Sequence, residues 1–451
     1  MASDMTKGRI LPQITAFAVP LILGNLFQIM YNATDSIIVG HFVGEGALAA
    51  VGTAGPIMNM VILFISGMCM GAGILMSTLF GSKNIEKLEK QISTTLIGGL
   101  VFSLVISVVM ILLARPILLI INSPKAIIGS AVTYLRIVFF GLIFTFIYNF
   151  LANTLRALGD SRTPLYFLII SAVFNILGDL FFVVALDWGV AGSAVSTVLS
   201  EALCTICCAV YVKLRVPILC LGKKWKVFEK QLLWRTFSFG LTGALQQMCV
   251  QLGKILVQSI INVQGVAFIA AFTAINRIDD FVLSPEANIA HATTTFLAQN
   301  RGAGNTERVK KGCICGFFME VVFSLAASII IYFSADELMR LFVDEKSIEV
   351  VTLGVSYLKV IALMYIMPAI TNILQGIFRG LGDLKVTLAS TIVNMGVRVI
   401  AAYILISVMG NGFSDLAWSN FWGWVFMMLL EIPLFVKSLL KMRSGPKSET
   451  Y

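Results

Sequence analysis

The sequence predicts an all-α integral membrane protein of twelve transmembrane helices arranged in two six-helix lobes. Hydrophobic residues make up 58% of the 451 positions and charged residues only 13%, and the mean hydropathy is +0.90. A soluble domain is about a quarter charged, so this chain lacks the polar residues needed to cover a soluble surface. Its apolar residues fall into runs of spanning length, and short motifs repeat between the two halves of the chain.

A transmembrane helix needs about 20 mostly apolar residues. Runs of this kind give twelve predicted spans, at residues 14–40, 46–81, 91–114, 130–155, 163–186, 189–212, 231–262, 265–298, 311–334, 350–378, 385–407 and 413–438. The first run is itself long enough to span, and no short apolar segment with a small-residue cleavage site precedes it. We therefore expect no removed signal peptide.

The basic residues predict the orientation of these spans. The connections after spans 2, 4, 6, 8 and 10, together with the two termini, hold most of the 33 Lys and Arg residues. Connections on the other side, such as LDWG at 186–189 and NVQG at 262–265, hold almost none. Because cytoplasmic loops carry the excess of basic residues, we expect a multi-pass membrane protein with both termini cytoplasmic. The net charge of +9 follows from this pattern and does not indicate a nucleic-acid partner.

Three motif pairs indicate an internal duplication. TYLRIV at 133 matches SYLKVI at 356, LRALGD at 155 matches FRGLGD at 378, and GVAGSAVST at 189 matches GFSDLAWSN at 412, all at an offset of 223 residues. Two halves with an even number of spans keep the same orientation, which predicts lobes 1–222 and 223–451 related by a pseudo-two-fold axis along the membrane normal. Such lobes can rock around a central cavity, which favours transport over a channel or a membrane enzyme.

The LRALGD and FRGLGD motifs are interpreted as helix connections. A phosphate cradle would need more glycines and a basic residue in a fixed arrangement. A glycine instead ends one helix, an aspartate N-caps the next, and an arginine obeys the positive-inside rule. The residues in these roles are Arg156, Gly159 and Asp160 in the first half and Arg379, Gly382 and Asp383 in the second.

The eight cysteines predict neither a disulfide framework nor a metal site. Most lie in apolar runs, where cysteine behaves as a small hydrophobe. Cys313 and Cys315 form a CxC motif without a further Cys or His at zinc-like spacing. We interpret all eight as structural and expect no cofactor.

Five polar residues in the first half predict a cation site. Tyr31 and Asp35 are four positions apart in span 1, Asn175 and Asp179 have the same spacing in span 5, and Thr197 lies in span 6. Carboxylates within a membrane span are costly and usually functional. Two of them in a low-dielectric lobe cannot both stay ionised unless they share a proton or bind a cation such as Na⁺. The alternative is that each residue only stabilises helix packing.

The second half does not repeat this set. At the 223-residue offset Asp179 corresponds to Ala402, Asn175 to Arg398 and Thr197 to Asn420. Span 8 instead carries a different group of polar residues: Arg277, Asp279, Asp280, Glu286 and His291. Arg277 can pair with a neighbouring aspartate, or these residues can be structural. We predict a substrate cavity that includes Asp280, Glu286 and Arg398.

Four stretches together resemble the multidrug and toxic compound extrusion (MATE) transporters, over nearly the whole chain. They are YNATDSIIVGHFVG in span 1, LRALGDSRTPLY before span 5, NILGD within it and AQNRGAGNTER after span 8. The resemblance implies export of cationic or amphipathic compounds, driven by Na⁺ or H⁺. It implies that Asp35, Asn175, Asp179 and Thr197 line the cation site, with Tyr31 adjacent. The span 7 glutamate of another branch is absent here, which favours the DinF-like and MepA-like bacterial branches. The resemblance therefore implies a location in the bacterial plasma (inner) membrane.

Two competing functions stay open at this stage. A lipid-precursor flippase of the same superfamily would carry a more strongly cationic cavity. An intramembrane enzyme would need catalytic partners for its carboxylates, and no HExxH or Ser–Lys arrangement accompanies them. We therefore expect a non-enzymatic, monomeric transporter whose partners are small cationic or amphipathic molecules and membrane lipids. The sequence does not distinguish Na⁺ from H⁺ coupling.

Overall fold

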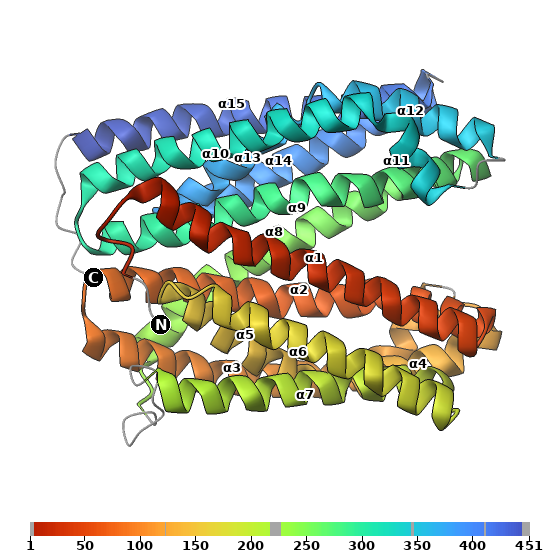
Figure 1. Ribbon diagram of the computed structural model, residues 1–451, viewed down its shortest axis with the longest axis horizontal. Helices are drawn as coiled ribbons and strands as arrows, with labels where there is room; N and C mark the ends of the chain where they lie inside the picture. Colours follow the sequence, from red (N-terminus) through yellow and green to blue (C-terminus); the bar gives the residue numbers. More distant parts are fainter. Residues whose placement is uncertain (1–3, 122, 217–226, 344–346, 410–411, 444–451) are drawn as a thin grey trace. The chain divides into compact units, whose positions relative to one another are not determined.

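The computed structural model describes residues 4–121, 123–216, 227–343, 347–409 and 412–443, and within these ranges the chain is helical with no strand (Figure 1). This confirms the predicted all-α fold class. Contacts divide the chain into two compact units. Unit 1 comprises Met1–Asp4 and Val19–Ala244, and unit 2 comprises Met5–Ala18 and Leu245–Tyr451. The predicted lobe boundary at 222/223 lies outside the described residues.

The two halves of the chain contain similar successions of helices, although the second half has two short elements without a counterpart among the described residues of the first. In the first half these are α1 (Ile10–Phe42), α2 (Glu45–Gly81), α3 (Ile85–Ile120), α4 (Lys125–Phe140), α5 (Leu142–Ala157), α6 (Arg162–Asp179), the π-helix η1 (Leu180–Ala185) and α7 (Gly189–Arg215). In the second half they are α8 (Lys230–Asn262), α9 (Val266–Gly302), α10 (Thr306–Phe333), α11 (Ala335–Phe342), α12 (Ile348–Ala362), α13 (Ile366–Gly380), α14 (Leu384–Ala402), the π-helix η4 (Tyr403–Val408), the short 3₁₀ turn η5 (Phe413–Asp415) and α15 (Leu416–Arg443). The duplication predicted from the motifs is thus present at the level of elements.

Among the described residues, eight helices are long and apolar enough to cross a membrane, and two bent pairs raise this number to ten. Helices α8 and α9 have spanning length, with 33 and 37 residues, but fall outside this apolar set. Both carry polar side chains along the predicted spans, including Lys254 and the Arg277–Asp280 group. The two helices are therefore the most polar of the predicted spans.

Two predicted spans are broken rather than continuous. Span 4 divides into α4 and α5 with a bend of 46° at Gly141, and span 10 divides into α12 and α13 with a bend of 56°. Gly141 packs against Val198 so closely that a Cβ there would lie 2.6 Å from a Val198 methyl carbon. In the second half, Pro368 lies in the first turn of α13, where a proline without an N–H is tolerated. The apolar pattern alone does not reveal these breaks.

The turn predictions are largely confirmed. Gly159 and Gly382 have positive φ angles of 84° and 81°, as helix-ending glycines do. Asp160 Oδ1 accepts from the backbone N–H groups of Arg162 and Thr163 at 3.1 and 3.0 Å, which caps α6. Asp383 occupies the N-cap position of α14, but its side chain makes no capping hydrogen bond.

Arg379 corrects another expectation. The side chain is 7% exposed, lies inside unit 2 and donates to Gln375 Oε1 at 2.9 Å, whereas the sequence predicted a loop cation. The charge is enclosed because Arg379 lies in the last turn of α13, a helix that packs extensively against α9. Seven cysteines are free thiols, consistent with their structural interpretation, and Cys220 lies outside the described residues.

Candidate functional site

The two aspartates of the predicted cation site meet inside unit 1. Asp35 lies in α1 and is 9% exposed, whereas Asp179 is the last residue of α6 and is fully buried. The two carboxyl groups lie close enough to interact with each other. Ser193 Oγ on α7 donates to Asp35 Oδ1 at 2.9 Å, while Asp179 Oδ1 has no protein donor among the described residues. Three helices therefore converge on one pair of carboxyls.

Asn175 connects this pair to α7. Its amide nitrogen, oriented toward the carboxyl, lies 3.0 Å from Asp179 Oδ2, and its amide oxygen lies 3.3 Å from the backbone nitrogen of Thr197. Ser196 Oγ donates to the backbone carbonyl of Asn175 at 2.8 Å. Because Asn175 and Asp179 are one helical turn apart, one face of α6 presents both side chains to α7. Figure 1 shows α6 and α7 running alongside each other.

Local geometry brings α6 and α7 this close together. A Cβ on Gly178 would lie 2.5 Å from Ser196 Oγ, so only glycine fits between the two helices at this position. Directly after Asp179 the α-helix gives way to the π-helix η1. Single π-helical turns of this kind are frequent at functional sites because they change the direction in which a side chain points. The sequence NILGD thus contains both the carboxyl group of Asp179 and the glycine that allows α6 and α7 to approach closely.

Thr197 and Tyr31 lie at the edge of the carboxyl pair. Both are partly buried, and the Tyr31 hydroxyl lies close enough to Thr197 and Asp35 to interact with them. One turn beyond Thr197 along α7, Glu201 accepts from Thr145 on α5 at 2.5 Å between Oε2 and Oγ1. Glu201 was not predicted as a site residue, although its position four residues after Thr197 places both on one face of α7.

The side chains that converge here offer oxygen atoms: two carboxyl groups, an amide and several hydroxyls. We call the set of Tyr31, Asp35, Asn175, Asp179, Ser193, Ser196 and Thr197 the carboxyl site. Hard cations prefer such oxygen ligands. In a low-dielectric interior two adjacent carboxylates require a proton or a cation. Asp179 Oδ1 has no protein donor among the described residues, so this atom is available to bind a proton or to coordinate a cation.

All five residues predicted for this site are thus brought together. Ser193 and Ser196 were missed, although both lie in the stretch VAGSAVST that was noted for its small residues. Their spacing relative to Thr197 and Ser200 was the available signal, since three and four residues separate neighbours on one helix face. A serine can also serve only for close packing, which is why the sequence did not single them out.

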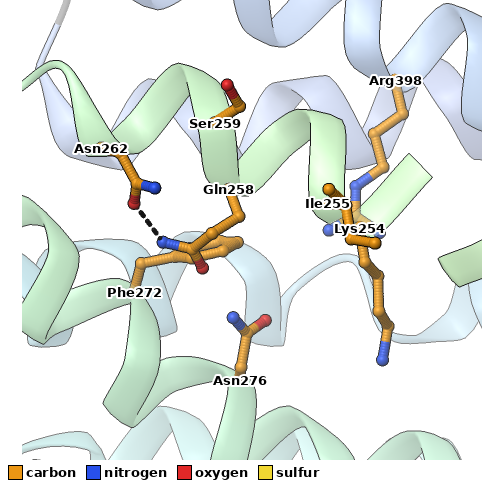
Figure 2. A pocket seen from close by; sticks show the side chains of 8 residues that line it. All are labelled: Lys254, Ile255, Gln258, Ser259, Asn262, Phe272, Asn276 and Arg398. Carbon is orange, nitrogen blue, oxygen red and sulfur yellow. Dashed lines mark hydrogen bonds between the residues drawn. The ribbon is translucent and has the colours of Figure 1, made fainter. Parts of the chain in front are cut away.

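The three residues predicted for a substrate cavity have different surroundings. Glu286 is fully buried, accepts from Asn372 Nδ2 at 3.4 Å, and has no partner for Oε1. Asp280 pairs with Lys254 at 3.8 Å between Oδ1 and Nζ, where both side chains are nearly half exposed. Arg398 lines a cavity of about 350 Å³ in unit 2, shown in Figure 2.

The two aspartates that were predicted as possible partners of Arg277, Asp279 and Asp280, contact other residues. Asp279 Oδ1 accepts from the hydroxyl of Tyr365 at 2.5 Å, and Asp280 pairs with Lys254. Arg277 itself is exposed. Unit 2 also encloses two carboxyl groups that the sequence did not indicate, Glu320 on α10 and Glu431 on α15, both fully buried. A single glutamate in a long apolar run gave no pattern from which to predict its burial.

Helical membrane architecture, internal duplication and an enclosed carboxyl pair define the class: a multi-pass membrane protein built for small-molecule transport. The model of the MatE family matches residues 20–181 and again residues 243–404, so the same domain occurs twice at an offset of 223 residues. The chain therefore belongs to the MatE family and is a bacterial-type MATE transporter, not an enzyme.

Relatives with assigned names support this family. The chain is 30% identical over 397 residues to "Probable multidrug resistance protein YpnP" of Bacillus subtilis, covering 88% of each chain. It is 28% identical to "Probable multidrug resistance protein YoeA" of the same organism, covering 89% of this chain and 88% of the relative. A solved outward-facing MATE family transporter of the MOP superfamily superposes with a TM-score of 0.89 at 21% identity, covering 99% of this chain and 98% of that one. This likeness supports the twelve-helix, two-lobe fold.

Proposed function

We propose that this MATE transporter is a Na⁺- or H⁺-coupled antiporter that exports lipophilic cations by alternating access. The observation that carries the proposal is the enclosed carboxyl pair Asp35–Asp179, held by Asn175 and Ser193. Buried ionisable groups within membrane helices typically mark ion or proton pathways. The names of the relatives, multidrug resistance proteins, favour drug-like small molecules as the exported compounds.

Coupling follows from the exchange of ligands at the carboxyl site. A cation or proton that binds between Asp35 and Asp179 draws α1, α6 and α7 together, because each helix contributes a group to the site. A ligand shifts a conformational equilibrium only by its differential affinity for the two states. We infer that an occupied carboxyl site favours one conformation of the protein and an empty one favours the other. Both termini are proposed to be cytoplasmic.

Resistance measurements test the substrate class. The protein is expressed in a drug-sensitive bacterial host, which is exposed to ethidium and to an anionic toxic compound of similar size. The proposal predicts that the inhibitory concentration rises more for ethidium than for the anionic compound. The Asp35→Asn substitution should abolish this increase. Equal protection against both compounds, or protection unaffected by Asp35→Asn, would count against it. Lipid-precursor transport would give no resistance to either compound.

A further inference from the structure

The cavity of unit 2 occupies the same place in the duplicated sequence as the carboxyl site of unit 1. Its lining residues come from three helices and include Lys254 and Gln258 on α8, Phe272 and Asn276 on α9, and Arg398 on α14 (Figure 2). At the 223-residue offset Tyr31 corresponds to Lys254, Asp35 to Gln258 and Asn175 to Arg398. The fourth position, Asp179, corresponds to Ala402. At these four positions the second half therefore has two cations and no carboxyl, whereas the first half has two carboxyls and no cation.

Two carboxyl groups lie near these cations: Asp280 pairs with Lys254, and Asp279 interacts electrostatically with both Lys254 and Arg398. In the view of Figure 2, Lys254 and Arg398 lie on one side of the cavity, and Phe272, Gln258 and Asn262 lie on the other. Among the ion pairs of the described residues, Lys254 has one carboxylate partner, Asp280, at 3.8 Å, a long contact in which both side chains are nearly half exposed. Surface pairs of this kind are weak. The Arg398 Nε atom is buried without a hydrogen-bond partner among the described residues.

The remaining lining groups suit an amphipathic ligand. Gln258 Nε2 donates to Asn262 Oδ1 at 2.8 Å, which fixes the orientation of an amide at the cavity wall. Asn276 and Ser259 add further polar groups. Phe272 is 4% exposed and offers an aromatic wall opposite the cations. Pockets that bind small molecules commonly combine an apolar wall with a few polar groups that fix the ligand's orientation.

We propose that this cavity binds the anionic group of an amphipathic molecule, a carboxylate or phosphate, between Lys254 and Arg398. A guanidinium presents a planar set of donors that matches carboxylate and phosphate oxygens, and an ammonium adds a compact charge. The apolar part of the molecule packs against Phe272. The site is distinct from the carboxyl site, and the inference concerns binding of an anionic group, from a soluble compound or a lipid headgroup, rather than its export.

Binding measurements on the purified full chain in nanodiscs of phosphatidylcholine test this inference. The probe is dansylglycine, and the matched neutral probe is dansylglycinamide. We expect dansylglycine to bind at least about tenfold more tightly, since hydrogen bonds to charged groups contribute at this scale. Lys254→Gln and Arg398→Gln should each remove most of that preference while leaving dansylglycinamide binding nearly unchanged.

Two further variants sharpen the result. Arg277→Gln removes an exposed cation on α9 that does not line the cavity and should leave the preference intact. Asp280→Asn removes the only carboxylate paired with Lys254 in the described ion pairs and should raise dansylglycine affinity several-fold. This gain cannot arise from misfolding, so it keeps the test decisive if Arg398→Gln fails to fold.

Competition identifies the source of the anion. Displacement of dansylglycine when phosphatidylglycerol replaces part of the phosphatidylcholine assigns the site to a lipid headgroup; unchanged binding assigns it to soluble compounds. Equal affinity for the two dansyl probes, or a preference that survives the Lys254→Gln/Arg398→Gln double variant, would overturn the inference. Neither result bears on the carboxyl site, because the probes are followed by binding rather than by gradient-driven export.

Discussion

Ser193 supplies a hydroxyl that donates to Asp35 at the carboxyl site, and this contact gives a residue-scale prediction. Ser193 Oγ donates to Asp35 Oδ1 at 2.9 Å. A hydrogen bond to a charged group contributes about 1.5–3 kcal/mol. Ser193→Ala should therefore change the ion concentration at half-maximal transport by about tenfold or more, while the fold is retained.

Ser200 supplies the matched control on the same helix. Its hydroxyl donates to the backbone carbonyl of Thr197 at 2.9 Å and does not reach either aspartate in the described contacts. Ser200→Ala should leave the ion dependence unchanged within about twofold. If both serine variants shifted the ion dependence equally, Ser193 would act through helix packing rather than through Asp35. Transport assays at varied Na⁺ concentration and pH measure the ion dependence of both serine variants.

The carboxyls of unit 2 give a second residue-scale prediction. Asp280 forms a half-exposed pair with Lys254, and Glu286 accepts one hydrogen bond of 3.4 Å from Asn372. Neither belongs to the carboxyl site. Asp280→Asn and Glu286→Gln should therefore preserve the dependence of transport on the ion gradient, although the preference among substrates changes. Loss of coupling in either variant would move the coupling site to unit 2.

At the scale of elements, the α6–α7 contact is the critical one. Gly178 faces Ser196 so closely that a methyl group would lie 2.5 Å from Ser196 Oγ. Overpacking of this kind costs about 1–3 kcal/mol and moves the helices apart. Gly178→Ala should lower the thermal unfolding temperature and weaken coupling together, because Asn175 and Asp179 move with the helix.

Gly129 on α4 provides the comparison. A Cβ there meets no atom within 4 Å, and the residue is exposed. Gly129→Ala should leave the thermal unfolding temperature unchanged or raise it, since alanine favours the helix by up to about 1 kcal/mol. A melting temperature lowered equally in both variants would show that glycine at position 178 is not required for close packing.

Element-scale features also separate what the sequence predicts from what it does not. The helix-ending glycines of LRALGD and FRGLGD follow from turn chemistry that acts within a few residues, and their positive φ angles confirm them. The bends at Gly141 and before α13 depend on which side chains another helix presents, such as Val198, and no local pattern records that. Burial of Arg379 depends in the same way on packing with α9.

In the carboxyl site, too, some residues could be predicted from the sequence and others could not. Intramembrane aspartates are rare enough that Asp35 and Asp179 could be predicted from composition, and i,i+4 spacing added Asn175. Ser193, Ser196 and Glu201 were not predicted, because a serine or glutamate in a helix has several common structural roles. The buried carboxyls of Glu320 and Glu431 likewise became evident only from their enclosure.

At the scale of the whole molecule, the segment Met5–Ala18 near the N-terminus is part of unit 2. Arg308 on α10 donates to the backbone carbonyl of Met5 at 3.0 Å and to Gln13 Oε1 at 3.1 Å. Met5 is 2% exposed. Arg308→Ala should lower the unfolding temperature by an amount that corresponds to about 1–3 kcal/mol, because it removes several such hydrogen bonds. Lys311→Ala, at an exposed position of the same helix, should have little effect.

The central claim is that the Asp35–Asp179 pair couples ion flow to export, and one measurement tests it directly. Wild-type protein and Asp179→Asn are reconstituted into vesicles, Na⁺ and pH gradients are imposed separately, and the accumulation of a fluorescent cationic dye is followed. We predict that the wild type accumulates dye in response to one of the gradients. The Asp179→Asn protein should be folded and should bind dye, but without gradient-driven accumulation. Full accumulation with unchanged ion dependence in Asp179→Asn would contradict the account and make α9 the better candidate for coupling.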